Sequence, residues 1–194
     1  MKLDIKYLKK EEKDFPEGLR QLKDCPDVLY VLGDEKLLNS FSIAVVGARR
    51  CTLDGERVAR QVSAELSDFG IHIVSGLAYG IDSIAHEASL GKKGKTVAVL
   101  AYGMEYLYKN NREKLYEDIL EKGGVIVSEY LPEEPPNKIK FHKRNRIIAA
   151  LSQGVLVVEA RKGSGSLITA DYAKELGKDI FVVPGSVFDE NYIR

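Results

Sequence analysis

From residue 41 onward, short apolar runs alternate with longer segments whose apolar residues recur at helical spacing. The short runs are rich in β-branched residues and apolar throughout, which is typical of strands buried on both faces. They predict strands over 43–46, 71–74, 96–100, 125–127, 155–159 and 180–183, and helices over 54–69, 81–90, 111–122, 141–151 and 166–176. Strands that alternate with helices form parallel sheets covered on both sides. The pattern therefore predicts an α/β fold with a doubly wound, mostly parallel Rossmann-like sheet.

Residues 1–40 lack this alternation. They carry dense charge and a turn-rich stretch at 15–18, and the apolar run 28–32 predicts one strand. A length of 194 residues suits one α/β domain with a small addition. We interpret residues 1–40 as an N-terminal appendage or linker and residues 41–194 as the Rossmann-like domain.

Composition narrows the function classes. The chain has 29 basic and 29 acidic residues, so nucleic-acid binding would need a local basic patch. Its two cysteines form neither a disulfide framework nor a zinc motif, and we expect a reducing, cytoplasmic location. No apolar run approaches ~18 residues and no apolar leader is visible, so we expect neither a membrane span nor a signal peptide.

Three loops of small residues follow predicted strands or precede a predicted helix, at 47–50, 75–80 and 163–166. Ligands of doubly wound sheets bind at the carboxyl ends of the strands, and exposed amides at a helix N-terminus favour phosphate. A tight turn also needs glycine for its own sake. The three loops together favour a phosphate site, and the candidate residues are Gly47, Arg49, Ser75, Gly76, Gly163, Ser164, Gly165 and Ser166.

Motifs of the common nucleotide enzymes are absent. There is no G-x-x-x-x-G-K-[ST] and no G-x-G-x-x-G after the first strand, which argues against a P-loop protein and a dinucleotide dehydrogenase. No nucleophile is paired with a base and no metal-ligand motif occurs; Glu129 and Glu159 at strand ends are the remaining candidate acids. We therefore expect no catalysis, no cofactor and no metal.

The segment 138–146 is the most distinctive local feature. Five of its nine residues are basic, namely Lys138, Lys140, Lys143, Arg144 and Arg146. Acidic partners at helical spacing are missing, so we expect this charge to be uncompensated. Phe141 interrupts it, and cations together with a stacking ring suit single-stranded nucleic acid. Two alternatives stay open, a solvated helix face and a Phe141 that anchors the core.

At these residues the chain resembles the DNA-processing protein A (DprA/Smf) family over nearly its whole length. The matching motifs lie at 15–19, 45–49, 75–86, 128–130, 141–149, 158–160, 165–170 and 183–185. Each motif alone is weak, but the set is highly specific.

The resemblance implies a Rossmann-like domain that binds single-stranded DNA and helps to load RecA recombinase onto it in natural transformation and recombination, without catalysis. By motif position it implies DNA contacts from Arg49, Lys138 and Phe141 and from the backbone of Gly47, Ser75 and Gly76. We add Lys143, Arg144 and Arg146 as candidates. Expected partners are single-stranded DNA, RecA and single-strand-binding protein. A homodimer stays open, because typical members continue beyond residues 189–194 through a segment for self-association.

Two rival functions belong to other classes. The same broad fold group includes nucleotide-monophosphate phosphoribohydrolases, whose P-G-G-x-G-T-x-x-E motif carries a catalytic glutamate. The corresponding loop at 162–169 lacks both the adjacent glycine pair and the glutamate, so this enzyme is the second choice. A sensor of a small nucleotide in the same crevice is the third.

Overall fold

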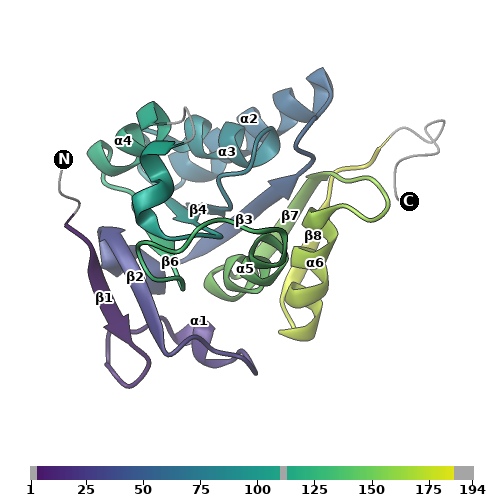
Figure 1. Cartoon of the computed structure of the whole chain (residues 1–194). Helices are drawn as coiled ribbons and strands as arrows, with labels where there is room; N and C mark the ends of the chain where they lie inside the picture. Colours follow the sequence, from purple (N-terminus) through teal and green to yellow (C-terminus); the bar gives the residue numbers. More distant parts are fainter. Residues whose placement is uncertain (1–3, 110–112, 186–194) are drawn as a thin grey trace.

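The computed structural model describes residues 4–109 and 113–185, and it has three layers, with helices on both sides of one sheet (Figure 1). The described residues form eight strands in the order β1-β2-β6-β5-β4-β3-β7-β8. Their bounds are β1 Lys6–Lys9, β2 Val28–Gly33, β3 Ser42–Gly47, β4 His72–Ser75, β5 Thr96–Val99, β6 Val125–Ser128, β7 Gly154–Glu159 and β8 Asp179–Val182. Strands β3 to β8 are all parallel, which confirms the predicted doubly wound Rossmann-like fold.

Helices cover the two faces of the sheet as separate groups (Figure 1). One face carries α2 (Leu53–Asp68), α3 (Ile81–Ser89) and α4 (Glu113–Glu121); the other carries α1 (Glu17–Arg20), α5 (Lys138–Leu151) and α6 (Gly165–Glu175). Short 3-10 helices occupy Glu35–Asn39 (η1) and Met104–Lys109 (η2). Residues 111 and 112 of the helix predicted over 111–122 lie outside the described residues. None of the described helices is long and apolar enough to cross a membrane.

Helix α5 begins three residues before its predicted start at Phe141. The Asn137 side chain accepts a hydrogen bond of 2.9 Å from the Lys140 amide and so caps the helix at Lys138. The basic residues upstream of Phe141 are therefore helical as well, and their directions follow the helical period.

The N-terminal segment contributes to the sheet itself. Strand β2 pairs antiparallel with β6, and β1 pairs antiparallel with β2. Leu29 and Val31 of β2 are fully buried, which gives this segment two anchors in the core. Sequence analysis expected one strand here, whereas the structure has two. The division into residues 1–40 and 41–194 stays a prediction.

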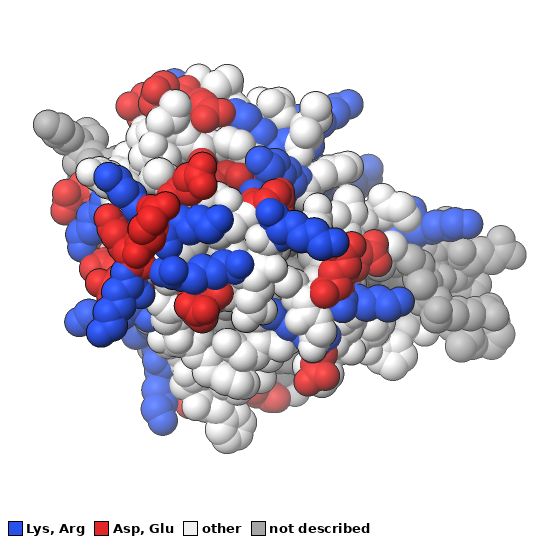
Figure 2. Space-filling view, turned by 90° about the horizontal axis from the view of Figure 1, so that it is seen from below, with Lys and Arg blue, Asp and Glu red and all other residues white. Residues whose placement is uncertain are grey.

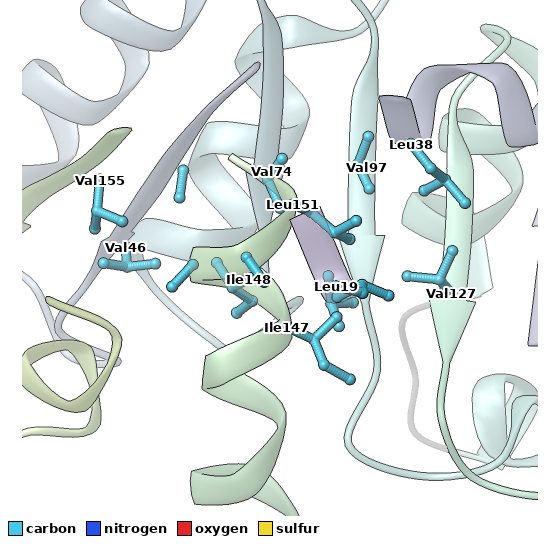
Figure 3. Close-up of a cluster of buried hydrophobic side chains, with 14 of the residues drawn as sticks. Leu19, Leu38, Val46, Val74, Val97, Val127, Ile147, Ile148, Leu151 and Val155 are labelled. Atoms are coloured by element: carbon cyan, nitrogen blue, oxygen red, sulfur yellow. The ribbon is translucent and has the colours of Figure 1, made fainter. Parts of the chain in front are cut away.

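The largest core cluster lies between the sheet and α5 (Figure 3). Valines from five strands meet apolar residues of α5, α1 and η1; those labelled in the figure are Val46, Val74, Val97, Val127, Val155, Ile147, Ile148, Leu151, Leu19 and Leu38. All of the α5 members come from its C-terminal half. The core therefore fixes that half of α5, while its N-terminal half extends along the carboxyl ends of the strands.

A buried ionic network joins α5 to the N-terminal segment. Arg146 is 1% exposed and makes two hydrogen bonds to the Glu129 carboxylate, of 2.9 and 2.7 Å. Its Nε donates to Asp24 at 2.7 Å. Lys143 also lies 3.4 Å from Glu129, but its side chain is about half exposed. Three segments distant in sequence thus meet at one guanidinium.

We predict that Arg146→Met lowers the free energy of unfolding by roughly 3 kcal/mol, because it leaves Glu129 buried without its main partner. Lys143→Met removes an exposed partner of the same carboxylate and should cost less than about 1 kcal/mol. Chemical denaturation of both variants measures the difference. Equal losses would show that the Arg146 network does not hold the N-terminal segment.

Candidate functional site

Helical spacing divides the basic segment 138–146 between different faces of α5. Lys138, Phe141 and Asn145 are three and four residues apart and share the face beside the strand ends. Lys140 lies on another face, where its ammonium is 2.7 Å from Glu134. Lys143 likewise pairs with Glu129. The expectation of uncompensated charge is therefore wrong for these lysines, because carboxylates from other segments neutralise them.

The molecular surface shows the same mixture of charges. Figure 2 shows Lys and Arg side chains beside Asp and Glu side chains over the face seen from below in the orientation of Figure 1. Neighbouring charges of opposite sign weaken each other's field at a distance. On this face, a binding site for an anion therefore depends on local groups and not on a broad basic surface.

The two arginines of the segment are buried. Arg144 is 3% exposed and Arg146 is 1% exposed, so neither presents its charge on the outer surface. Arg144 donates from Nη1 to the carbonyl oxygens of Gly76 and Val99, at the ends of β4 and β5. Burial lowers the pKa of Arg144 to about 10, against the attraction of Asp82. Arg144 thus ties α5 to the edge of the sheet.

A cavity of about 530 Å³ opens between the N-terminal half of α5 and the carboxyl ends of the strands. We call it the α5 cavity. Its lining residues are Val46, Gly47, Ala48, Arg49, Ala78, Asp82, Lys138, Phe141, His142, Arg144, Asn145, Ile148, Ser164, Gly165, Ser166 and Thr169. The structure thus brings together most of the residues that sequence analysis selected from three separate loops and one helix.

Five of the selected residues do not line the α5 cavity, namely Ser75, Gly76, Gly163, Lys143 and Arg146. Ser75 is fully buried below it, and its hydroxyl donates to the Val45 carbonyl at 2.6 Å. Gly76 lines a neighbouring cavity. Lys143 and Arg146 face the Glu129 carboxylate instead.

Arg49 and Phe141 form a pair at the mouth of the α5 cavity. The guanidinium carbon lies 5.3 Å from the centroid of the ring, and no carboxylate among the described residues pairs with Arg49. Phe141 is half-buried, and its ring contacts Tyr102 at 6.3 Å between centroids. One side of the ring therefore packs on the core, while the residue still lines the cavity. Arg49 keeps its charge available for an anion.

The N-terminus of α6 forms another wall of the α5 cavity. Ser164 occupies the cap position, but no side chain of the described residues caps the first amides. Instead, its hydroxyl lies 2.7 Å from the Ser166 hydroxyl, and Asn145 donates to the Gly165 carbonyl at 2.9 Å. Uncapped amides at a helix N-terminus carry partial positive charge and attract anions.

The glycines of the loop after β4 suggested a phosphate site, but amides of this loop bind the Asp82 carboxylate instead. Asp82 is 5% exposed, and its carboxylate accepts hydrogen bonds from the amides of Gly76 and Ala78 at 3.1 and 3.4 Å. Burial raises the pKa of Asp82, which the Arg144 charge and the amides oppose. These two amides are therefore occupied from within the protein. A methyl group on Gly76 would come within 2.4 Å of the Arg144 guanidinium, which explains the glycine.

Gly47 permits close packing at the end of β3. The register between β3 and β7 shifts between Val46 and Gly47, and such bulges redirect the chain next to binding sites. A Cβ on Gly47 would lie 2.6 Å from the Ile81 side chain of α3. The absence of a side chain lets the Arg49 loop lie directly on α3.

Asn145 and Asp82 are site residues that sequence analysis did not select. Asn145 stands seven residues after Lys138 and four after Phe141, so extending the helix to Lys138 would have placed it on the cavity face. Asp82 gave no such signal, because its partners are backbone amides of a loop. Its place depends on how that loop folds.

The two remaining candidate acids are held outside the α5 cavity. Glu129 binds Arg146, and Glu159 accepts hydrogen bonds of 2.9 Å from both the amide and the hydroxyl of Thr52, at the start of α2. Within residues 4–109 and 113–185, no three His, Cys, Asp or Glu side chains gather as a metal site requires.

We predict that Gly76→Ala lowers the free energy of unfolding by roughly 2 kcal/mol, because the added methyl group displaces the Arg144 guanidinium. Gly165→Ala is the matched control, since its Cβ would meet nothing closer than 3.8 Å and alanine suits the first turn of a helix. Thermal melting compares the two. A Gly76→Ala protein as stable as the control would contradict the packing described here.

Comparison with known proteins places the chain in a family. The model of the DNA recombination-mediator protein A family matches residues 6–192. The DNA processing protein DprA of Bacillus subtilis is 43% identical over 178 residues, which are 91% of this chain and 60% of that protein. The chain therefore spans little more than half of that relative.

Solved structures agree in fold. DprA from Streptococcus pneumoniae has a TM-score of 0.89 at 39% identity, covering 97% of this chain and 66% of the other. DNA processing protein A from Helicobacter pylori, described for its single-stranded DNA binding mode, has a TM-score of 0.87 at 34% identity, covering 96% and 84%. Since the family model spans almost the entire sequence and these structures superpose over it, the chain belongs to the DNA recombination-mediator protein A family, DprA/Smf.

Proposed function

We propose that the chain binds single-stranded DNA in the α5 cavity. The observation that carries this proposal is the combination in one concave site of an aromatic ring, an arginine and a helix N-terminus, the last two having no carboxylate partner and no side-chain cap among the residues that the structure describes. Cations that follow a phosphate backbone and a ring that stacks on a base are the usual means of binding a single strand. The H. pylori relative, described for binding single-stranded DNA, supports the same ligand.

Each side chain has a distinct role in this proposal. Arg49 holds a phosphate through two parallel hydrogen bonds, which a lysine cannot reproduce. Phe141 stacks on a base, and Lys138 at the start of α5 adds a charge contact. The amides of Gly165 and Ser166 border the same space beside the backbone of Gly47, and they donate hydrogen bonds to a second phosphate oxygen. Arg144 is a positioning residue, since it holds the wall of the cavity.

The mixed-charge surface favours a single strand over a duplex. A duplex needs a broad basic face to neutralise two phosphate backbones, whereas the basic residues seen in Figure 2 are interspersed with acidic ones. An unpaired base can enter a cavity, and a base within a duplex cannot. We further propose that the site binds without catalysis, because the Asp82 carboxylate on its wall is engaged with backbone amides.

Affinity for a fluorescent dT oligomer across a salt series tests these roles. Arg49→Lys should lose much of the affinity although the net charge is unchanged. Phe141→Ala should weaken binding by ~1–3 kcal/mol with nearly the same salt dependence. Lys138→Ala should reduce the slope of log affinity against log salt by about 0.7. Lys93→Ala removes an exposed lysine outside the α5 cavity and serves as the charge control.

Two outcomes of this experiment would overturn the proposal. One is unchanged affinity in folded Arg49→Ala and Phe141→Ala proteins, which would move the site elsewhere. The other is tighter binding of a duplex than of the single strand. Incubation with AMP is run in parallel, because release of free base would support the phosphoribohydrolase alternative.

We also propose that the bound strand is passed to RecA recombinase. The support is the family itself, whose description is that of a recombination mediator. The expected result is faster RecA filament formation, followed by RecA ATPase activity, on DNA already coated by single-strand-binding protein. Arg49→Ala should lose this stimulation together with DNA binding. A chain that binds DNA but leaves RecA unaffected would contradict this second step alone.

A further inference from the structure

A smaller cavity of about 250 Å³ adjoins the α5 cavity. We call it the tyrosine cavity, and its lining residues are Arg49, Gly76, Leu77, Ala78, Tyr79, Tyr102, Tyr106, Lys109, Pro136 and Phe141. Three tyrosine rings and one phenylalanine ring therefore line this space together with two cationic side chains, those of Arg49 and Lys109. Tyr79 belongs to the loop 75–80, whereas Tyr102 and Tyr106 lie outside both the basic segment and the three loops.

We propose that the tyrosine cavity is a second base subsite, which holds the nucleotide next to the one stacked on Phe141. The proposal rests on the proposed binding of single-stranded DNA and deepens it, since the site then recognises a two-nucleotide step. The ligand chemistry is an unpaired, stacking base attached to a phosphate.

The shared wall of the two cavities is the first support. Arg49, Ala78 and Phe141 line both of them. In a single strand, one phosphate separates each base from the next. A phosphate held by Arg49 at this boundary would have one base on the α5 side and the next base on the tyrosine side.

The chemistry of the lining is the second support. Tyr79 is 64% exposed, so its ring is accessible from solvent. The Lys109 ammonium lies 4.0 Å from the centroid of the Tyr106 ring. Rings that stack on bases beside cations that meet phosphates are the combination that binds single strands with little base preference.

The backbone of the 76–79 loop is the third support. Leu77 has a φ of +52°, a backbone conformation that residues other than glycine seldom adopt. Asp82 holds the amides on either side of it, and Arg144 holds the Gly76 carbonyl. A strained loop fixed from both sides is typical of a binding surface. This loop presents Tyr79 to the tyrosine cavity.

The test compares wild-type protein with the double variant Tyr79→Ala/Tyr106→Ala in binding to a dT ten-mer. Loss of one stacked base should reduce affinity by about 5-fold to 150-fold. The slope against log salt should stay nearly the same, because no charge is removed. Tyr7→Ala is the matched control, since Tyr7 is 56% exposed on β1 at the far edge of the sheet (Figure 1). Melting curves establish that each variant is folded.

Cross-linking gives a second, independent measurement on the unmodified protein. A dT oligomer with one 5-iodouracil is irradiated with wild-type protein, and the linked peptides are identified by mass spectrometry. Links to Tyr79 or Tyr106 support the second subsite. Links confined to residues 138–146, or a double variant that binds like Tyr7→Ala, would overturn it and leave the proposed function intact. Failure of the wild-type chain to bind the oligomer would instead overturn the proposed function itself.

Discussion

The arrangement of the site depends on one peptide group, that of Gly76 at the end of β4. Arg144 reaches from α5 to its carbonyl oxygen, and Asp82 reaches from α3 to its amide. These contacts set the distance between α5 and the strand ends, and thus the width of the α5 cavity. They also hold Leu77 in its unusual backbone conformation. Both buried side chains fix the loop in addition to Leu77, which is itself buried in a hydrophobic cluster.

Burial of the Arg144 and Asp82 charges disfavours the charged form of each group, and their pKa values shift accordingly. Burial lowers the pKa of Arg144 to about 10 and raises that of Asp82, so each charged form is disfavoured by its surroundings. Apolar residues of similar size are often at least as stabilising at such positions. They could not, however, orient the two sides of a peptide group. Arg144 and Asp82 bind opposite sides of one peptide group and so define the cavity wall.

Patterns along the chain predicted every described strand except β1, and most helices, because central strands such as β5, β6 and β7 are buried along their whole length and largely apolar. The expectation of burial on both faces is wrong for β8, whose four residues are all exposed at the edge of the sheet. They also located the loops at 47–50 and 163–166 that border the α5 cavity. They could not predict which basic residues are neutralised, since Glu129 and Asp24 reach Arg146 only after folding. The cap at Asn137 was missed, and with it the cavity face that includes Asn145. The first error arises because the partner is remote in sequence, whereas the missed cap lies only three residues from the amide that it binds.

The division of α5 into faces also bears on how genetic data for this motif should be interpreted. A screen for loss of function would recover substitutions at Arg144 and Arg146 as readily as at Lys138 and Phe141. The first two lie inside the protein, with 3% and 1% of their surface exposed, so their loss would lower protein abundance, and loss of Arg144 would also disturb the wall of the α5 cavity. Comparing steady-state protein levels would separate the two groups. The dense basic motif thus combines, within nine residues, side chains that pack inside the protein and side chains that line the proposed binding site.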